Sequence, residues 1–199
     1  LNGKSNINVN GKLTPKLKSI EGLIELDRLN IGYVQPVLAD VFSQMEGTIS
    51  GKIMIDGPWN SLSISSEDTR LNSAILKVAY TNVPYYADGT FHLDDRGVYF
   101  DDIEISDNSS GYGSVTGSIN YDHFRDITFD TRIKANDIEC INLDEAQADV
   151  FYGKIYATGN ISITGPVNSL MMDIDAVTSR EGQFHIPLSN VSSNTASNN

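Results

Sequence analysis

Hydrophobic and polar residues alternate along most of the chain. Leu76, Val78 and Tyr80, for example, stand at every second position, and residues such as Ser, Thr, Asn, Asp and Lys lie between apolar ones. This period of two places every second side chain on one face of a β-strand. Turn sequences such as Asp56-Gly57-Pro58 and Gly165-Pro166 separate the runs. The pattern predicts an all-β antiparallel meander with one apolar face and one polar face.

Two stretches depart from the strand period. Residues 33–46 carry an apolar stripe at helical spacing, formed by Val34, Val37, Leu38, Val41, Phe42 and Met45. Residues 141–151 show a weaker version, with Asn142 or Asp144 as a possible N-cap. We therefore expect one or two short amphipathic helices beside the strands. The sequence leaves open whether they plug the sheet or cap its ends.

The chain contains an internal repeat. Residues 51–62 match residues 159–170 at 8 of 12 positions, and ADVF occurs at both 39–42 and 148–151. We interpret residues 1–30 as strands of a preceding repeat, 31–137 as the first repeat, 138–188 as the start of a second, and 189–199 as a disordered polar tail. Stacked repeats build a continuous sheet, so a terminal edge is expected to pair with a further repeat.

Composition excludes several classes of protein. The chain has 199 residues with 26 acidic and 14 basic side chains, a net charge of −12 and a pI near 4.5. A surface this acidic repels phosphate backbones, so nucleic acid is not an expected partner. The single cysteine, Cys140, excludes an intrachain disulfide. The chain begins at Leu1 without a signal peptide, and we interpret it as part of a longer protein.

The sequence offers little chemistry for catalysis. His92, His123 and His185 are isolated, and no metal-binding His spacing, GxSxG elbow or phosphate-binding glycine loop is present. We therefore predict no enzyme, no catalytic residue, no cofactor and no metal site. One acidic cluster suits Ca²⁺ by ligand type, although a solvated face with acidic turn caps explains it better: Asp94, Asp95, Asp101, Asp102, Glu104 and Asp107.

Three aromatic residues suit a sugar-stacking platform. Tyr85 and Tyr86 follow Pro84, and Trp59 is a further aromatic residue of exposed character. Packing of these rings across neighbouring strands is the simpler interpretation.

The apolar face is the strongest candidate site. Its residues close against a second sheet in a β-sandwich, or line an apolar groove if the sheet bends into an open trough. Composition does not separate the two. The groove candidates are Ile53, Ile55, Phe91, Leu93, Val98, Phe100, Ile103, Ile105, Val115, Ile119, Ile127, Phe129, Ile133, Ile161 and Ile163.

Residues 20–190 resemble the C-terminal region of the TamB family, the translocation and assembly module subunits of the AsmA-like superfamily. The resemblance is carried by the two G-x-I-x-I-x-G-P turns, the run at 88–107, G-x-V-x-G-x-I at 113–119 and G-x-F-x-I-P-L at 182–188. The Asn-, Ser- and Tyr-rich style resembles that of Bacteroidetes proteins. The family implies an elongated, curved antiparallel sheet, called a β-taco, whose concave side is an apolar groove.

The resemblance also implies a function. TamB-like proteins are anchored in the inner membrane, cross the periplasm and act with an outer-membrane β-barrel, the TamA-like partner. The expected ligands are phospholipid acyl chains in transit between the two membranes, or β-strands of outer-membrane and autotransporter clients. On this interpretation the chain is a periplasmic piece of the groove, without the anchor and the last segment. The alternative is a closed β-sandwich binding or adhesion module without a lipid groove.

Overall fold

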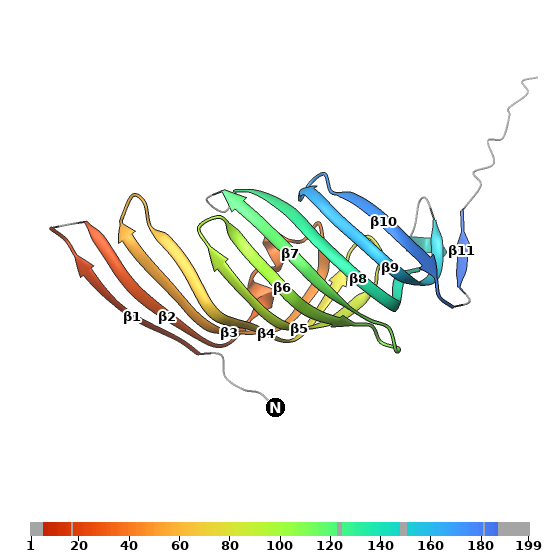
Figure 1. The fold of residues 1–199 in the computed structure, drawn as a ribbon, viewed down its shortest axis with the longest axis horizontal. Coiled ribbons are helices and arrows are strands. Elements are labelled where there is room, and N and C mark those ends of the chain that lie inside the picture. Colours follow the sequence, from red (N-terminus) through yellow and green to blue (C-terminus); the bar gives the residue numbers. More distant parts are fainter. Residues whose placement is uncertain (1–5, 17, 123–124, 148–150, 181, 187–199) are drawn as a thin grey trace, which may run out of the picture.

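The computed structural model describes residues 6–16, 18–122, 125–147, 151–180 and 182–186. Eleven strands form one antiparallel sheet, in which β1 to β10 lie side by side in chain order and β11 pairs with the start of β9 (Figure 1). The strands are β1 (Asn6–Thr14), β2 (Ser19–Asn30), β3 (Phe42–Pro58), β4 (Ser63–Val78), β5 (Pro84–Asp94), β6 (Gly97–Ser106), β7 (Tyr112–Asp122), β8 (Arg125–Leu143), β9 (Tyr152–Pro166), β10 (Met171–Thr178) and β11 (Gln183–His185).

The sheet is open. Within the described residues, β1 pairs only with β2 and β10 only with β9, so the sheet does not close on itself. This confirms the predicted fold class, an all-β protein with one open, curved antiparallel sheet. The alternative of a closed β-sandwich is wrong, because in the described part of the chain all eleven strands belong to a single sheet and none forms a second sheet over the apolar face.

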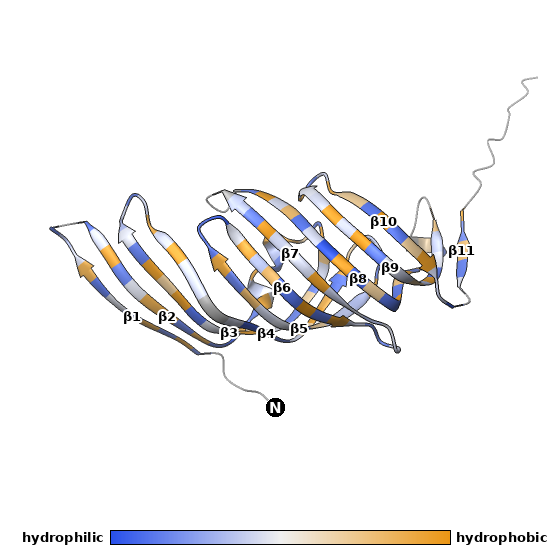
Figure 2. Cartoon of the chain, in the orientation of Figure 1, coloured by the Kyte–Doolittle hydropathy of each residue, from blue (hydrophilic) through white to orange (hydrophobic). Residues whose placement is uncertain are grey.

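The alternation of the sequence appears as an alternation of burial. Along β3, Ile53 and Ile55 are half-buried on one face, and Lys52, Met54 and Asp56 between them are exposed on the other. The pleat of a strand enforces this arrangement, because successive side chains point to opposite faces. Figure 2 shows the same alternation of apolar and polar positions along most of the strands.

A line of β-bulges bends the strands into a trough. In β2, β4 and β8 one residue beside a bulge has a left-handed backbone, at Arg28, Ser73 and Asp137 (φ 54°, 47° and 52°). The amide N–H of each donates to a side chain on the next strand: Arg28 to Ser50 Oγ (3.1 Å), Ser73 to Asp88 Oδ1 (2.8 Å) and Asp137 to Thr158 Oγ1 (2.9 Å). Since a bulge bends its strand and increases its twist, the line acts as a crease across the sheet. We call it the crease.

Close backbone approach at the crease requires glycine. Gly47 in β3 has φ +115°, and a Cβ added there would lie 2.6 Å from the Cα of Ala74 in β4. Ala74 is itself fully buried. A larger residue at Gly47 would therefore push β3 and β4 apart where the sheet bends.

The segment between β2 and β3 packs against the trough at the crease. It forms two 3-10 turns, η1 (Ile31–Tyr33) and η2 (Gln35–Val37). Ile31 packs on Ala74, Ala87 and Ile103, which are buried residues of three different strands. We call residues 31–41 the plug. The segment contacts the groove side of the sheet through Ile31 and leaves Tyr33, Val34 and Val37 exposed, so it occupies one corner of the trough and does not cap an end of the sheet.

The helix predicted over 33–46 is shorter than expected. Only the two 3-10 turns form, and β3 begins at Phe42. Phe42 and Met45 pair with Val78 and Leu76 of β4, so these two residues belong to a strand of the sheet and not to a helix. Continuing a helix through them would leave the second half of β4 without a ladder partner on this side.

The second predicted helix, at 141–151, is also reduced. Strand β8 continues to Leu143, and one 3-10 turn, η3 (Glu145–Gln147), follows. Residues 148–150 and the predicted polar tail at 189–199 lie outside the described residues.

The two copies of the sequence repeat have the same geometry. Gly57 and Gly165 both have positive φ, at 118° and 101°. In each turn the residue after proline donates its N–H to the neighbouring segment: Trp59 N to Lys18 O just before β2 (2.8 Å), and Val167 N to Ile127 O in β8 (2.9 Å). The copies thus place β2, β3 and β4 in the same relation as β8, β9 and β10.

Candidate functional site

Strand register brings the predicted groove residues onto one face. Across β6 to β10 one row of direct neighbours is Ile103, Val115, Ile133, Ile161 and Ile174. Across β5 to β8 a second row is Leu93, Val98, Ile119 and Phe129. Directly paired residues of neighbouring strands point to the same side of the sheet. Residues far apart in the chain therefore form continuous apolar rows.

The remaining candidates join these rows. Phe91 pairs with Phe100, and their rings meet edge to face with centroids 6.4 Å apart. Ile163 pairs with Thr131, the neighbour of Phe129 on the same face. Ile127 is placed on this side by strand alternation, two residues before Phe129. Ile105 pairs with Ala87, and Ile53 and Ile55 continue the face in β3 beside Ser66 and Ile64 of β4.

This face, which we call the groove face, is only partly covered. Of the fifteen predicted residues, Phe91, Ile103 and Phe129 are buried, with 9%, 4% and 7% of their surface exposed. The other twelve are half-buried. A closed hydrophobic core would bury most of them, whereas here they line an open surface. The geometry is therefore that of an apolar trough.

Polar groups on the groove face are few and mostly satisfied within the protein. The Ser66 hydroxyl accepts a hydrogen bond from the amide of Leu93 (3.0 Å), and the Thr131 hydroxyl donates to the carbonyl of Ile163 (3.4 Å). Thr69 is 1% exposed, and its hydroxyl has no partner in the described residues. The apolar rows of this face contain no Asp, Glu, Lys or Arg. Such a face offers apolar contact without a charge to desolvate.

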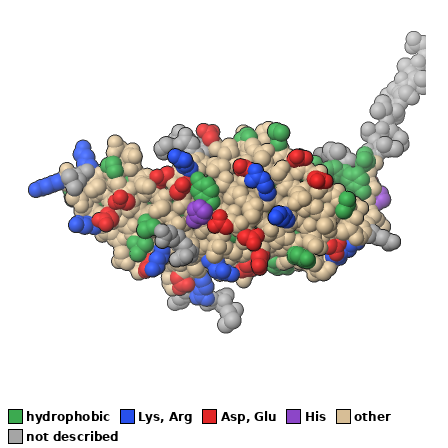
Figure 3. Space-filling model, viewed as in Figure 1, with side chains coloured by type: hydrophobic (Ala, Val, Ile, Leu, Met, Phe, Trp, Pro, Cys, Tyr) green, Lys and Arg blue, Asp and Glu red, His purple; other side chains and the backbone are tan. Residues whose placement is uncertain are grey.

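The opposite face of the sheet is polar and charged. Its positions include Glu25 and Lys52, which form an exposed ion pair (3.9 Å), and Asp130 and Arg132, which form another (3.6 Å). Figure 3 shows acidic and basic side chains scattered over the face of the molecule turned to the viewer. Each of these exposed pairs adds little to stability. Their arrangement leaves one face of the sheet charged and solvated and the other face apolar.

Apolar residues of the groove face continue to both open edges. On β1, Ile7, Val9 and Leu13 are 56–65% exposed, and on β10 Met172 and Ile174 are 49% and 59% exposed. Direct pairing aligns Val9 with Ile24, and Ile174 with Ile161. The site predicted from the sequence did not include these edge residues, nor Ile20, Ile24 and Leu26 of β2 and Ile64 of β4. Their period-two spacing is the signal that could have identified them.

The acidic cluster is dispersed, since Asp101, Asp102 and Glu104 lie along β6 and the other three residues lie at the turns on either side of it. Asp94 caps the β5–β6 turn, where it accepts hydrogen bonds from the amides of Arg96 (2.8 Å) and Gly97 (3.2 Å); the bond from Arg96 is the main cause that lowers the pKa of Asp94. Asp107 is buried and accepts the amides of Ser109, Gly111 and Glu139. Within the described ranges no three His, Cys, Asp or Glu side chains are grouped to hold a metal ion. Backbone amides thus satisfy these two carboxylates.

The aromatic platform suggested by Tyr85, Tyr86 and Trp59 does not form. Tyr85 points to the groove side, where its hydroxyl donates to the carbonyl of Glu139 (2.8 Å) and burial raises its pKa. Tyr86, the next residue of β5, points to the opposite face. Trp59 lies in the turn between β3 and β4.

Two of the histidines lie on exposed strand surface, where each stacks on a tyrosine: His92 on Tyr99 (4.9 Å) and His185 on Tyr152 (4.8 Å). His123 lies outside the described residues. Burial raises the pKa of the Cys140 thiol, which favours the neutral form over the reactive thiolate.

The fold and site define a class: an open antiparallel β-trough with an apolar concave face and a charged outer face. In the part of the chain that the structure describes, no helix has the length and hydropathy to cross a bilayer. Comparison of the chain with protein-family models, curated proteins and solved structures finds no match in any of the three.

Proposed function

We propose that this chain is a section of a TamB-like, periplasm-spanning groove that carries phospholipid acyl chains between the inner and outer membranes. The observation that carries the proposal is the groove face, whose charge-free apolar rows cross the sheet and stay half-exposed. On this proposal the chain belongs to the periplasmic part of an inner-membrane-anchored protein. It performs no catalysis and needs no cofactor.

The chemistry of the groove face suits a lipid tail. Burial of one CH₂ group is worth about 0.8 kcal/mol, so partial enclosure of a tail is favourable without any specific polar contact. Strands β1 to β10 have 8 to 19 residues, so at about 3.3 Å per residue they span up to roughly 26 to 63 Å, a width over which a curved sheet can enclose a tail. Headgroups would stay in water at the open side of the trough, since the rows themselves present no charged partner for them.

The open edges support a second ligand for the same protein. Within the described residues no further strand pairs with the outer edges of β1 and β10, which carry exposed apolar side chains, and such edges accept an added strand. A β-strand of an outer-membrane or autotransporter client is the corresponding candidate. In the full-length protein, the TamA-like outer-membrane barrel is the proposed partner.

The test is lipid retention by matched variants. We would purify the chain and identify copurifying phospholipid by native mass spectrometry and solvent extraction. The groove variant carries Ile53→Asp and Ile55→Asp; the control carries Met54→Asp, on the same strand but on the exposed opposite face. Wild type and control should retain phospholipid, and the groove variant should lose it. A lipid-free wild type that also binds no added phospholipid vesicles would overturn the proposal.

A second measurement covers the case in which the charged variant does not fold. A photoreactive residue at Ile163 points into the trough, whereas one at the neighbouring Ser162 points out of it. Crosslinks to phospholipid should form at Ile163 and not at Ser162. Equal crosslinking at both sites would contradict a groove-bound lipid. Crosslinks to protein at Ile174, on the β10 edge, would favour the client strand.

A further inference from the structure

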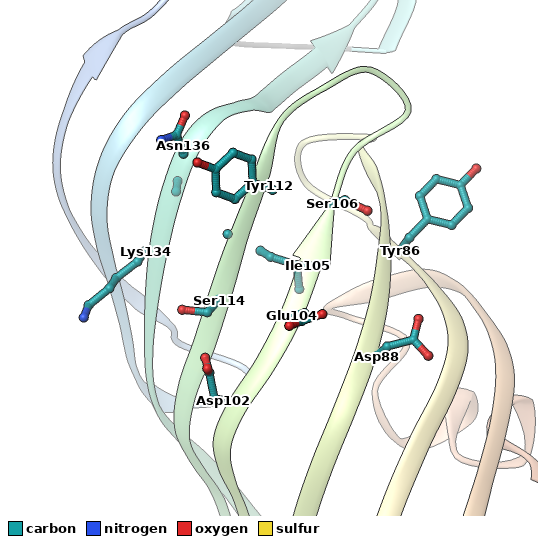
Figure 4. A pocket seen from close by; sticks show the side chains of 12 residues that line it. Tyr86, Asp88, Asp102, Glu104, Ile105, Ser106, Tyr112, Ser114, Lys134 and Asn136 are labelled. Atoms are coloured by element: carbon teal, nitrogen blue, oxygen red, sulfur yellow. The ribbon is translucent and has the colours of Figure 1, made fainter.

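The outward face of the sheet carries a shallow hollow of about 690 Å³ over β5 to β8 (Figure 4). Its floor consists of small residues, Ser106, Gly113 and Ser114, which leave room between larger neighbours. The side chains of Tyr86, Ser106 and Tyr112 lie on the side of the sheet opposite the groove-face rows, so the lipid proposal does not use them; Ile105, a groove candidate, also lines the hollow.

Two exposed tyrosines flank the hollow. Tyr86 of β5 and Tyr112 of β7 both pair directly with Ser106 of β6, so the three side chains form one row. In Figure 4 the two rings lie on either side of Ser106. Tyr86 and Tyr112 are 40% and 60% exposed, and neither packs against another aromatic ring in the described residues. The Tyr86 hydroxyl donates to Asn108 Oδ1 (2.6 Å), which restrains its ring.

The spacing of the two tyrosines matches the repeat length of a β-1,4-linked sugar chain. They lie on alternate strands, so their backbones are about 10 Å apart, two strand spacings. Alternate rings of an extended β-1,4-linked sugar chain are separated by a similar length and present the same face. The apolar C–H face of a sugar stacks on an aromatic ring, as amphipathic aromatic side chains allow.

The rest of the lining supplies hydrogen-bonding groups. Glu104 and Lys134 stand on either side of Ser114 in a second row, and Asn136 continues the tyrosine row. Within the described residues the four side chains of this set make no hydrogen bond and no ion pair, so acceptors and donors are both free for a ligand. The set is Glu104, Ser114, Lys134 and Asn136. The lining holds three carboxylates, those of Asp88, Asp102 and Glu104, against one cation, Lys134. An anionic ligand is therefore disfavoured.

We propose that this hollow binds a neutral β-1,4-linked glycan, with Tyr86 and Tyr112 stacked on alternate sugar rings. Glu104, Lys134 and Asn136 then bond to hydroxyl and acetamido groups at the ring edges. The bound glycan lies on the outer face, so it leaves the trough open. This binding is independent of the lipid proposal, and either can fail without the other.

The probe is tetra-N-acetylchitotetraose, titrated into ¹⁵N-labelled protein and followed by NMR. Amide shifts should concentrate at Ser106, Ser114 and Asn136. The double variant Tyr86→Ala, Tyr112→Ala should weaken binding at least about tenfold, since each stacked ring contributes of the order of 1 kcal/mol. The control Tyr33→Ala removes another exposed tyrosine, on the plug, and should leave the affinity unchanged.

Three outcomes would overturn the glycan site. The first is absence of shifts at about 10 mM tetrasaccharide, far above the Kd of a weak specific site. The second is a double variant, folded by circular dichroism, that binds as tightly as wild type. The third is equal binding of an anionic hyaluronan tetrasaccharide, which the acidic lining should reject.

Discussion

The plug offers the sharpest test of how the trough is held together. Ile31 is 4% exposed and packs on Ala74, Ala87 and Ile103, which come from three different strands at the crease. Ile31→Ala removes three carbon atoms from this corner. We expect the change to lower the free energy of unfolding more than truncation of an exposed side chain in the plug.

The magnitude follows from the burial. Loss of three buried carbons costs about 2.4 kcal/mol in transfer free energy at about 0.8 kcal/mol each. A cavity adds to this, because Ala74 and Ala87 are too small to fill the space and the crease backbone is closely packed. Measured Ile→Ala changes of this kind cost about 2 to 5 kcal/mol, so we expect about 3 to 4 kcal/mol.

Urea denaturation followed by circular dichroism measures the effect. With an m-value of about 2 to 3 kcal/mol/M, the midpoint should fall by about 1 to 2 M. The control is Val37→Ala in the same plug, where the side chain is 57% exposed and the loss should stay below about 0.5 kcal/mol. Equal midpoints for the two variants would refute the assignment of Ile31 as the buried anchor of the plug.

Two further predictions concern the carboxylates near the crease. Asp107→Ala should lower the free energy of unfolding by about 3 kcal/mol in the same assay, because it leaves three amide donors without their acceptor; a loss below about 1 kcal/mol would contradict this. The hydrogen bond from Arg180 holds the pKa of Asp137 below its ordinary value of 3.8, so this carboxylate stabilises the fold above that pH and the contribution disappears as the pH falls through the lowered pKa. Arg180→Gln should raise the Asp137 pKa in an NMR titration and make acid unfolding less steep below about pH 4; an unchanged titration would show that the pair does not form in solution.

The two faces of the sheet could be predicted from the sequence with residue accuracy. Ile133 and Ile161, for example, were assigned to the apolar face from alternation alone, and the register makes them direct neighbours. Alternation predicts the face of each residue because the pleat leaves only two directions for a side chain. The polar residues between the apolar ones then decide which of the two faces is in contact with water. The Gly-Pro repeat likewise identified two turns that share one geometry.

The helix predicted from the apolar stripe at 33–46 was wrong where residues of the stripe pair with a neighbouring strand. Val34 and Val37 have helical spacing, but Phe42 and Met45 of the same stripe pair with β4 instead. Local periodicity contains no information on that partner, which lies about 30 residues further along the chain. The two tyrosines of the outward hollow illustrate the same gap, because only strand order places Tyr86 and Tyr112 on either side of Ser106.

The amino-acid sequence by itself determined the fold class, the two faces and the turns, because these depend on neighbouring residues and on backbone geometry. Only the tertiary structure decided whether the apolar face closes or stays open, since the same alternation serves a sandwich and a trough. The decision depends on the bulges with Arg28, Ser73 and Asp137, on the tight contact of Gly47 with Ala74, and on Ile31 filling the corner. These are long-range contacts between strands, and they bend one sheet around a plug instead of folding two sheets together.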